Sequence, residues 1–149
     1  MRWGAYMKIV VFVDDSKHSF DAVKITGQIA KTTGAVVTIL GIAPRYSDSE
    51  LVKSYGEKIK DETSFMLEEA KKIMDEFGVH PKVEILEDVT LLNVLDEVIS
   101  FIKERGFDLV IIGSSGLKGL KKFFYRGIGR DIGTVLIDSA PCSVLVVRN

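Results

Sequence analysis

Apolar residues along the chain gather into short runs that are separated by segments with helical spacing. Four of these runs are nearly unbroken and rich in β-branched residues: 8–13, 35–40, 108–112 and 143–147. A fifth run, 82–86, alternates polar and apolar side chains. Unbroken runs are typical of parallel strands covered on both faces, and alternation is typical of a strand with one face less buried. The pattern therefore predicts five strands, with 82–86 near an edge of the sheet.

The segments between these runs carry apolar residues three and four positions apart, which predicts helices. The first follows Ser19, a predicted N-cap, the third is opened by Thr90, and the fourth stops before Pro141. A glycine stands just after each of the first three, where a helix C-terminus favours one, at Gly34, Gly78 and Gly106. The only long irregular connection is predicted at 44–55.

Strands and helices alternate as β-α-β-α-β-α-β-α-β, which predicts an α/β fold with a doubly wound parallel sheet. Since 149 residues are the length of one ordinary domain, we expect a single domain over 7–149, preceded by a short N-terminal extension, residues 1–6.

Composition excludes several classes of protein. Twenty Lys and Arg stand against 21 Asp and Glu, so the overall basic excess of a nucleic-acid binder is missing. The single cysteine, Cys142, excludes an intramolecular disulfide. No apolar run approaches the roughly 18 residues that span a membrane. We therefore expect a cytoplasmic protein without nucleic-acid or membrane partners.

Ligands of doubly wound sheets bind beyond the carboxyl ends of the strands, near the point where the strand order reverses. The first strand is followed by Asp14-Asp15-Ser16, which suits a divalent cation, a ribose or a base edge, but also suits an ordinary turn. The fourth is followed by Gly113-Ser114-Ser115-Gly116 and several lysines. Glycine-rich backbone amides can cradle phosphate oxygens, although such a loop can equally be a solvated connection.

Signatures of catalysis are missing from the sequence. The glycine-rich loop lacks the Gly-Lys-Ser/Thr that closes a Walker A motif, and no Gly-x-Ser-x-Gly nucleophile elbow occurs. The glycines from 127 to 133 do not follow a strand, so they do not make a dinucleotide fingerprint. We therefore expect the protein not to be an enzyme.

Three segments taken together resemble the universal stress protein family: Ile9 to Ser16, Asp108 to Lys122, and Ala140 to Val147. The resemblance extends over nearly the whole chain from Met7. It implies a five-stranded sheet in the order 3-2-1-4-5, a role in stress response, and a homodimer formed through the last strand, Ser143 to Val147.

Family members that bind adenine nucleotides carry Gly-x2-Gly-x9-Gly-Ser/Thr, together with an aspartate after the first strand. By resemblance, Asp14 is that aspartate, Ile42 is the contact after the second strand, and Gly113 and Gly116 are the first glycine pair. The second half of the motif differs. Counting forward from Gly116 reaches Arg126-Gly127, and counting back from Ala140 reaches Arg130-Asp131, which indicates an insertion of about one helical turn around 125–129.

Three functions remain open. The first is binding of ATP or a related adenine nucleotide, with Mg²⁺, by Asp14, Ile42, Gly113, Gly116, Arg126, Gly127 and Arg130. The second is a protein-interaction module that binds no nucleotide and presents the altered loop, 125–131, to a protein partner. The third is a phosphoacceptor receiver domain, suggested by Asp14-Asp15. A receiver needs an aspartate ending the third strand and a lysine after the fifth, but Glu87-Asp88 and Arg148-Asn149 stand there.

Overall fold

The fold is built on one fully parallel sheet of five strands, in the order β3-β2-β1-β4-β5. The computed structural model describes residues 6–14, 17–43, 50–87, 93–114 and 132–148. The strands are β1 Lys8–Phe12, β2 Val36–Ile42, β3 Lys82–Leu86, β4 Leu109–Gly113 and β5 Ser143–Val147. This confirms the predicted α/β fold class, the strand order and the position of 82–86 at an edge.

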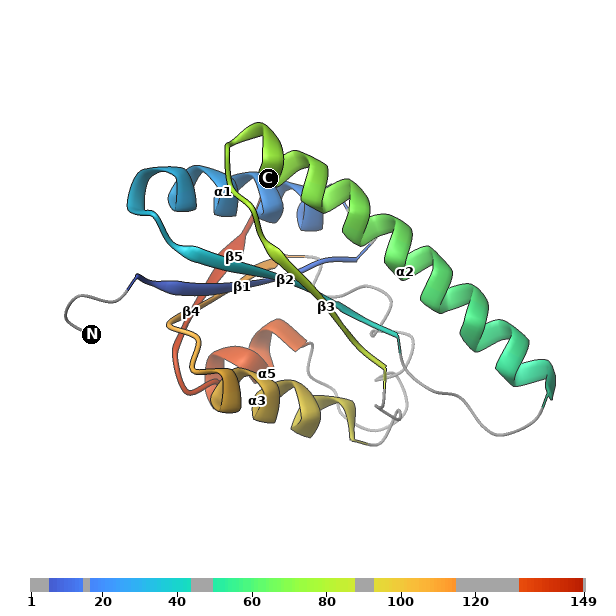
Figure 1. Ribbon diagram of the computed structural model, residues 1–149. Coiled ribbons are helices and arrows are strands. Elements are labelled where there is room, and N and C mark those ends of the chain that lie inside the picture. Colours follow the sequence, from blue (N-terminus) through green and yellow to red (C-terminus); the bar gives the residue numbers. More distant parts are fainter. Residues whose placement is uncertain (1–5, 15–16, 44–49, 88–92, 115–131, 149) are drawn as a thin grey trace.

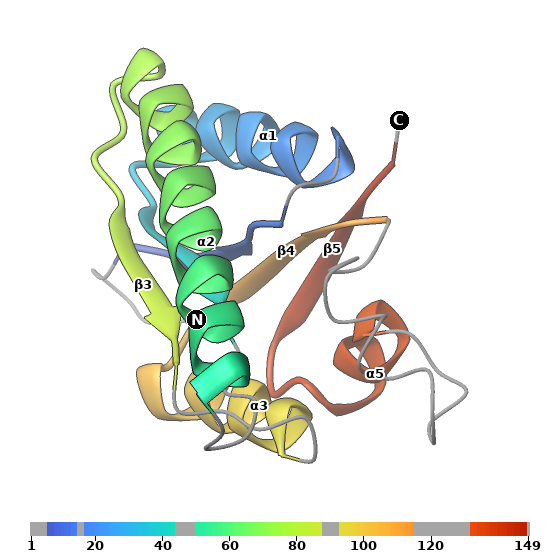
Figure 2. The same ribbon diagram turned by 90° about the vertical axis from the view of Figure 1, so that its right-hand side faces the viewer.

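Helices cover both faces of this sheet and make a three-layered molecule. They are α1 Lys17–Thr33, α2 Glu50–Glu76, α3 Val94–Arg105 and α5 Ile132–Ser139. Figures 1 and 2 show α1 and α2 on one face, and α3 and α5 on the other. All the connections between neighbouring parallel strands are therefore crossovers, as the alternating sequence pattern predicts.

Two hydrophobic cores lie on opposite faces of the sheet and explain why the strands read as unbroken apolar runs. Ile9 and Val11 of β1 pack into the core beneath α1 and α2. Val10 and Phe12, which alternate with them, pack with Val98 and Ile102 of α3 in the other core. Since successive side chains of a strand point to opposite faces, every position of a strand that is covered on both faces is buried and favours an apolar residue.

Three helices end in turns that require glycine. Gly34, Gly78 and Gly106 have φ angles of 71°, 74° and 66°, in the left-handed region that other residues enter at a cost. After α3, the Gly106 N–H donates to the Lys103 carbonyl and the Phe107 N–H to the Ile102 carbonyl, which is a Schellman pattern. The predicted C-terminal glycines are confirmed at all three positions.

The helix starts were predicted less well. α1 begins at Lys17, so the prediction that Ser19 caps it was wrong: this side chain lies inside the first turn. α2 begins at Glu50, so 50–55 is helix rather than part of a long irregular connection. Figure 1 shows the first turns of α2 projecting beyond the sheet. Asn93 stands at the cap position of α3, and Thr90 lies outside the described residues.

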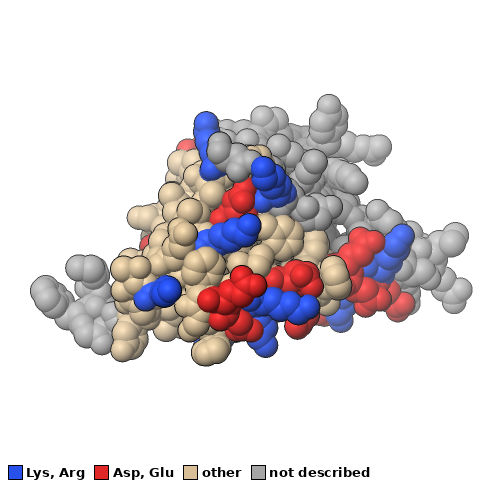
Figure 3. Space-filling view, turned by 90° about the horizontal axis from the view of Figure 1, so that it is seen from above, with Lys and Arg blue, Asp and Glu red and all other residues tan. Residues whose placement is uncertain are grey.

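Acidic side chains outnumber lysines along the outer face of α2 (Figure 3). Lys60 pairs with Glu87 at 3.1 Å and Lys72 with Glu69 at 3.1 Å, and the remaining carboxylates include those of Asp61, Glu62 and Glu68. This charge opposes the approach of a polyanion to the α2 side of the molecule. Within the described ranges, no helix is both long and apolar enough to cross a bilayer.

Candidate functional site

The strand order reverses between β1 and β4, because β1 leads through α1 to β2 on one side while β4 pairs on the other. In doubly wound sheets the crossover helices depart to opposite faces at such a point, and ligands bind beyond the carboxyl ends of the two strands. Asp14 follows β1, and Gly113 ends β4. Two of the residues that the sequence singles out therefore stand at the point where the strand order reverses.

The strand register brings three predicted site residues to neighbouring positions on adjacent strands. Phe12 lies opposite Leu40, and continuing this register places Asp14 level with Ile42. Val11 lies opposite Ile111, which by the same continuation places Val13 level with Gly113. Asp14 therefore lies between the end of β2 on one side and the end of β4 on the other, as a ligand contacting all three strands would require.

β2 continues past the end of its ladder with β1. The Val13 N–H donates to the Leu40 carbonyl at 3.0 Å, whereas on the other side the Ala43 N–H still donates to the Leu86 carbonyl at 3.0 Å. Since successive peptide groups alternate in direction along a strand, the N–H and C=O of Ile42 point toward the β1 side. The backbone of Ile42 thus faces the space beyond β1, where Asp14 lies.

Asp14 is nearly buried, with 8% of its surface exposed. Its backbone N–H donates to Ser19 Oγ at 2.8 Å, and the Ser19 hydroxyl donates to the Phe12 carbonyl at 3.4 Å. Ser19 itself is 3% exposed. One hydroxyl of α1 therefore holds the main chain on both sides of Val13, and this is the role that replaces the predicted N-cap.

Gly113 packs directly against the start of α1. A Cβ at this position would lie 2.6 Å from the carbonyl carbon and oxygen of His18 and 2.8 Å from the Ser19 nitrogen. These are backbone atoms that cannot rotate away, so any side chain would force α1 and β4 apart. The need for glycine at 113 follows from this close packing of helix and strand, independently of any ligand.

His18 is a second residue at this edge that sequence analysis did not place in the site. Its Nδ1 atom is buried and has no hydrogen-bond partner within the described ranges. Its backbone carries the contact with Gly113, 95 positions later in the sequence. No local pattern signals such a pairing; only the parallel register of β1 and β4 brings it about.

Several predicted site residues lie outside the described residues: Gly116, Arg126, Gly127 and Arg130, with the altered loop 125–131. Asp15 and Ser16, considered for a divalent cation, lie outside them too. Within the part of the chain that the structure describes, no group of three His, Cys, Asp or Glu side chains is arranged to hold a metal ion.

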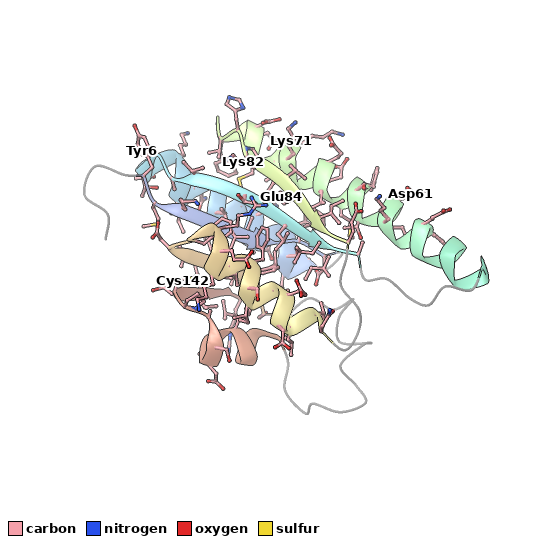
Figure 4. All side chains as sticks on the ribbon, turned by 60° about the horizontal axis from the view of Figure 1, so that its bottom comes forward. Tyr6, Asp61, Lys71, Lys82, Glu84 and Cys142 are labelled. Atoms are coloured by element: carbon pink, nitrogen blue, oxygen red, sulfur yellow. The ribbon has the colours of Figure 1, made fainter. Side chains whose placement is uncertain are left out.

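The opposite edge of the sheet is closed by long side chains. The Lys8 backbone N–H donates to Asp108 Oδ2 at 2.8 Å, the Lys8 ammonium donates to the Arg105 carbonyl, and this ammonium lies 5.4 Å from the centroid of the Phe107 ring. Arg105 pairs with Glu84 at 2.7 Å and stacks 5.1 Å from the Phe101 ring. Figure 4 shows Glu84 beside Lys82 on β3.

Cys142 lies near this amino edge, just before β5 (Figure 4). It is partly buried and packs, like a small apolar residue, against the core beneath α3 and α5. Burial raises the pKa of its thiol, and the carboxylate of Asp108 raises the pKa further. Both causes disfavour the thiolate, so the thiol is held in its less reactive form.

Comparison with known proteins identifies the family. The model of the universal stress protein family matches residues 5–148. The chain belongs to the universal stress protein family. A universal stress protein of Methanocaldococcus jannaschii is 30% identical over 151 residues, which cover 96% of this chain and 82% of that relative. The resemblance found in the sequence is thus confirmed, and the receiver domain is set aside.

Solved structures of the family share the fold. The universal stress protein from Archaeoglobus fulgidus in complex with dAMP aligns with a TM-score of 0.71 at 19% identity, covering 95% of this chain and 98% of that one. A family protein from Arabidopsis thaliana with AMP bound aligns with a TM-score of 0.64 at 17% identity, covering 96% and 92%. At these identities the likeness establishes the architecture, while the ligands are those of the two relatives.

Proposed function

We propose that this universal stress protein binds ATP or a related adenine nucleotide at the carboxyl edge of β1, β2 and β4. The observation that carries the proposal is the alignment of Asp14, Ile42 and Gly113 at the point where the strand order reverses. Adenine has an amino group that can donate a hydrogen bond to a carboxylate, and ring nitrogens that can accept one from a backbone N–H. Asp14 and the Ile42 backbone supply these two partners on neighbouring strands.

The phosphates would lie toward β4, where Gly113 and Ser114 begin the glycine-rich segment. α1 also begins at this edge, and its first turn contains no acidic residue, so the positive end of its dipole favours an anion there. Gly116, Arg126, Gly127 and Arg130 complete the site in the proposal, with Mg²⁺ as a counterion of the phosphates. The structures of relatives with dAMP and AMP support an adenine nucleotide as the ligand class.

The proposed role is binding in a stress response rather than catalysis, because the sequence carries neither a Walker A motif nor a nucleophile elbow. We place this activity in the cytoplasm. The alternative function, a protein-interaction module that binds no nucleotide, follows if the altered loop 125–131 prevents phosphate binding.

The experiment has two parts. Freshly purified protein is denatured and the released nucleotides are identified, and thermal unfolding of the intact protein is then measured with and without millimolar ATP and Mg²⁺. A ligand at 100 times its dissociation constant stabilises the native state by about 2.7 kcal/mol, which corresponds to several degrees in Tm for a chain of this size. If no nucleotide is released and Tm does not change, the proposal is contradicted and the interaction module is favoured.

Asp14→Asn is the informative variant, since it keeps the shape of the side chain and removes the charge of a nearly buried acceptor. We expect it to reduce the ATP-dependent rise in Tm, while Asp75→Asn, at the exposed end of α2, leaves it unchanged. Gly113 is unsuited to this purpose, because any substitution there disturbs the packing of α1.

We also propose that the protein is a homodimer formed along β5. Among the described strands, β5 pairs with β4 alone, at one edge of the sheet, and its residues Val144, Leu145 and Val146 are half-buried in the single chain. An apolar edge strand of this kind is a template for pairing with a second chain. Val147 accepts a hydrogen bond from Ser114 at 2.8 Å, so the peptide group of Val146 points outward.

Val146→Pro therefore removes an outward N–H and leaves the ladder with β4 in place. We expect sedimentation to show a dimer for the wild-type protein and a monomer for this variant. A wild-type monomer at high concentration would contradict pairing through β5.

A further inference from the structure

Ser19 occupies an unusual position for a helical serine, because its hydroxyl forms hydrogen bonds with the main chain at the end of the preceding strand, β1. It lies in the first turn of α1, is 3% exposed, and accepts the Asp14 N–H at 2.8 Å. Its own hydroxyl hydrogen is directed to the Phe12 carbonyl at 3.4 Å. By contrast, the hydroxyl of Thr26, also buried in α1, donates to the Ala22 carbonyl within the same helix at 2.7 Å.

The backbone N–H of Asp14 faces the β4 side of β1, because the Val13 N–H is directed to β2 and successive peptide groups alternate in direction. It lies past the end of the β1–β4 ladder, whose last paired residues are Val11 and Ile111. A buried N–H beyond the ladder needs another acceptor, because leaving it unpaired is costly. Ser19 supplies that acceptor and thereby fixes the main chain of Asp14 relative to α1.

α1 is in turn fixed against β4. Gly113 admits the backbone of His18 and Ser19 so closely that a Cβ would lie within 3 Å of both. The start of α1 is therefore held at two strands, at β1 through the Ser19 hydroxyl and at β4 through contact with Gly113. These are the two strands between which the sheet order reverses.

We propose that Ser19 is a positioning residue for nucleotide recognition, which holds Asp14 where its carboxylate meets the base. The inference rests on the proposed function. Ser19 reaches the ligand only through Asp14. Because the hydrogen bond is to the main chain of Asp14, its loss allows the carboxylate to move without changing its charge. Discrimination between bases depends on that placement, since adenine presents an amino donor where guanine presents a carbonyl acceptor.

The test compares Ser19→Ala with Thr26→Val in the full-length protein. Each variant deletes one buried hydroxyl of α1 with little change in shape, but only the first removes the acceptor for Asp14. Hydrogen exchange of the Asp14 amide, followed by NMR without nucleotide, is the first readout. We expect Ser19→Ala to accelerate this exchange at least tenfold relative to Thr26→Val. Equal exchange rates in the two variants would overturn the inference.

The second readout is the ratio of the dissociation constants for GTP and ATP, each measured by titration with Mg²⁺. We expect Ser19→Ala to weaken ATP binding about tenfold, the effect of losing one buried hydrogen bond, and to lower the ratio. Thr26→Val leaves the ratio unchanged, and Ser19→Thr, which keeps the hydroxyl, restores much of it. A variant that merely lost stability would not change base selectivity.

The outcomes separate the two proposals. If wild-type protein binds ATP but Ser19→Ala keeps its full selectivity, the positioning role is wrong and the proposed function stands. If wild-type protein binds neither nucleotide, the proposed function is wrong and the ligand part of the inference fails with it. Faster exchange at Asp14 together with lost selectivity supports both.

Discussion

The two edges of the sheet are built in different ways. At the amino edge, long charged and aromatic side chains cover the strand ends: Lys8, Arg105, Asp108 and Phe107 make mutual contacts there. At the carboxyl edge, the contacts of the described residues involve the main chain: the Asp14 backbone N–H donates to the Ser19 hydroxyl, and the backbone of Gly113 packs against that of His18. Among the described residues, the amino edge is thus held by side-chain contacts and the carboxyl edge by contacts of the main chain.

This difference teaches where a ligand can approach. An edge covered by long side chains has its backbone groups satisfied within the fold. At the carboxyl edge, the backbone of Ile42 faces the space beyond β1, and backbone donors recognise phosphates and bases. Stability at the carboxyl edge therefore depends on close packing, whereas the amino edge depends on polar contacts that solvent weakens.

The largest effect is expected from Gly113→Ala. The added methyl group would lie 2.6 Å from the His18 backbone, so α1 and β4 must separate, and overpacking of this kind lowers the free energy of unfolding by about 3 kcal/mol. Gly78→Ala is the matched control, because no neighbouring atom lies within 4 Å of a Cβ added there. Only the φ of 74° opposes this substitution, and it lowers the free energy of unfolding by about 1 kcal/mol. Urea denaturation measures both. Equal losses would show that packing at the carboxyl edge is not tight.

A smaller effect is expected from Arg105→Ala at the amino edge. It removes the pair with Glu84 and the stacking on Phe101. The two side chains of the pair are 50% and 28% exposed, so solvent screening limits the loss to about 1 kcal/mol. Lys72→Ala, which breaks a more exposed pair with Glu69, is expected to cost less than 0.5 kcal/mol. Chemical denaturation of the two variants measures whether Arg105→Ala lowers the free energy of unfolding more than Lys72→Ala.

Arg105→Ala also tests whether ATP binding at the carboxyl edge is independent of the amino edge. Because the residue lies at the opposite edge from Asp14, we expect the ATP-dependent rise in Tm to persist in this variant. Loss of that rise would mean that the two edges are not independent.

The smallest effect is expected from Asp108→Asn. Since the Asp108 carboxylate raises the pKa of the Cys142 thiol, removing its charge lowers that pKa and increases the thiolate fraction at pH 8. Alkylation of Cys142 by iodoacetamide should then be faster, yet slower than for a fully exposed thiol, because burial is the larger cause of the raised pKa. Asp75→Asn serves as control. An unchanged rate would contradict the electrostatic effect of the Asp108 carboxylate on the thiol.

Much of the fold is predictable from the sequence because its causes are local. The run Ser143–Val147 was predicted with its observed bounds, since β-branched residues covered on both faces leave a continuous apolar pattern. Gly34, Gly78 and Gly106 were predicted because a left-handed residue at a helix end is a requirement of one position.

The candidate site was predicted only in part because its causes are not local. Asp14 and Gly113 were selected by resemblance, but the contact of Gly113 with His18 depends on the register of β1 with β4. Ser19 was read as an N-cap because serine commonly serves that role, whereas its hydroxyl is engaged by Asp14. A hydrogen bond from a helix to the preceding strand leaves no periodic signal.

The most direct test of the account is a titration of the 16.5 kDa chain with ATP and Mg²⁺, followed by the amide NMR spectrum. The account predicts saturable shifts at the amides of Asp14, Ile42 and Ser114 along the carboxyl edge, with the amides of Lys8, Gly106 and Asp108 at the amino edge unchanged. A spectrum that does not change at millimolar ATP, or shifts confined to the amino edge, would contradict it.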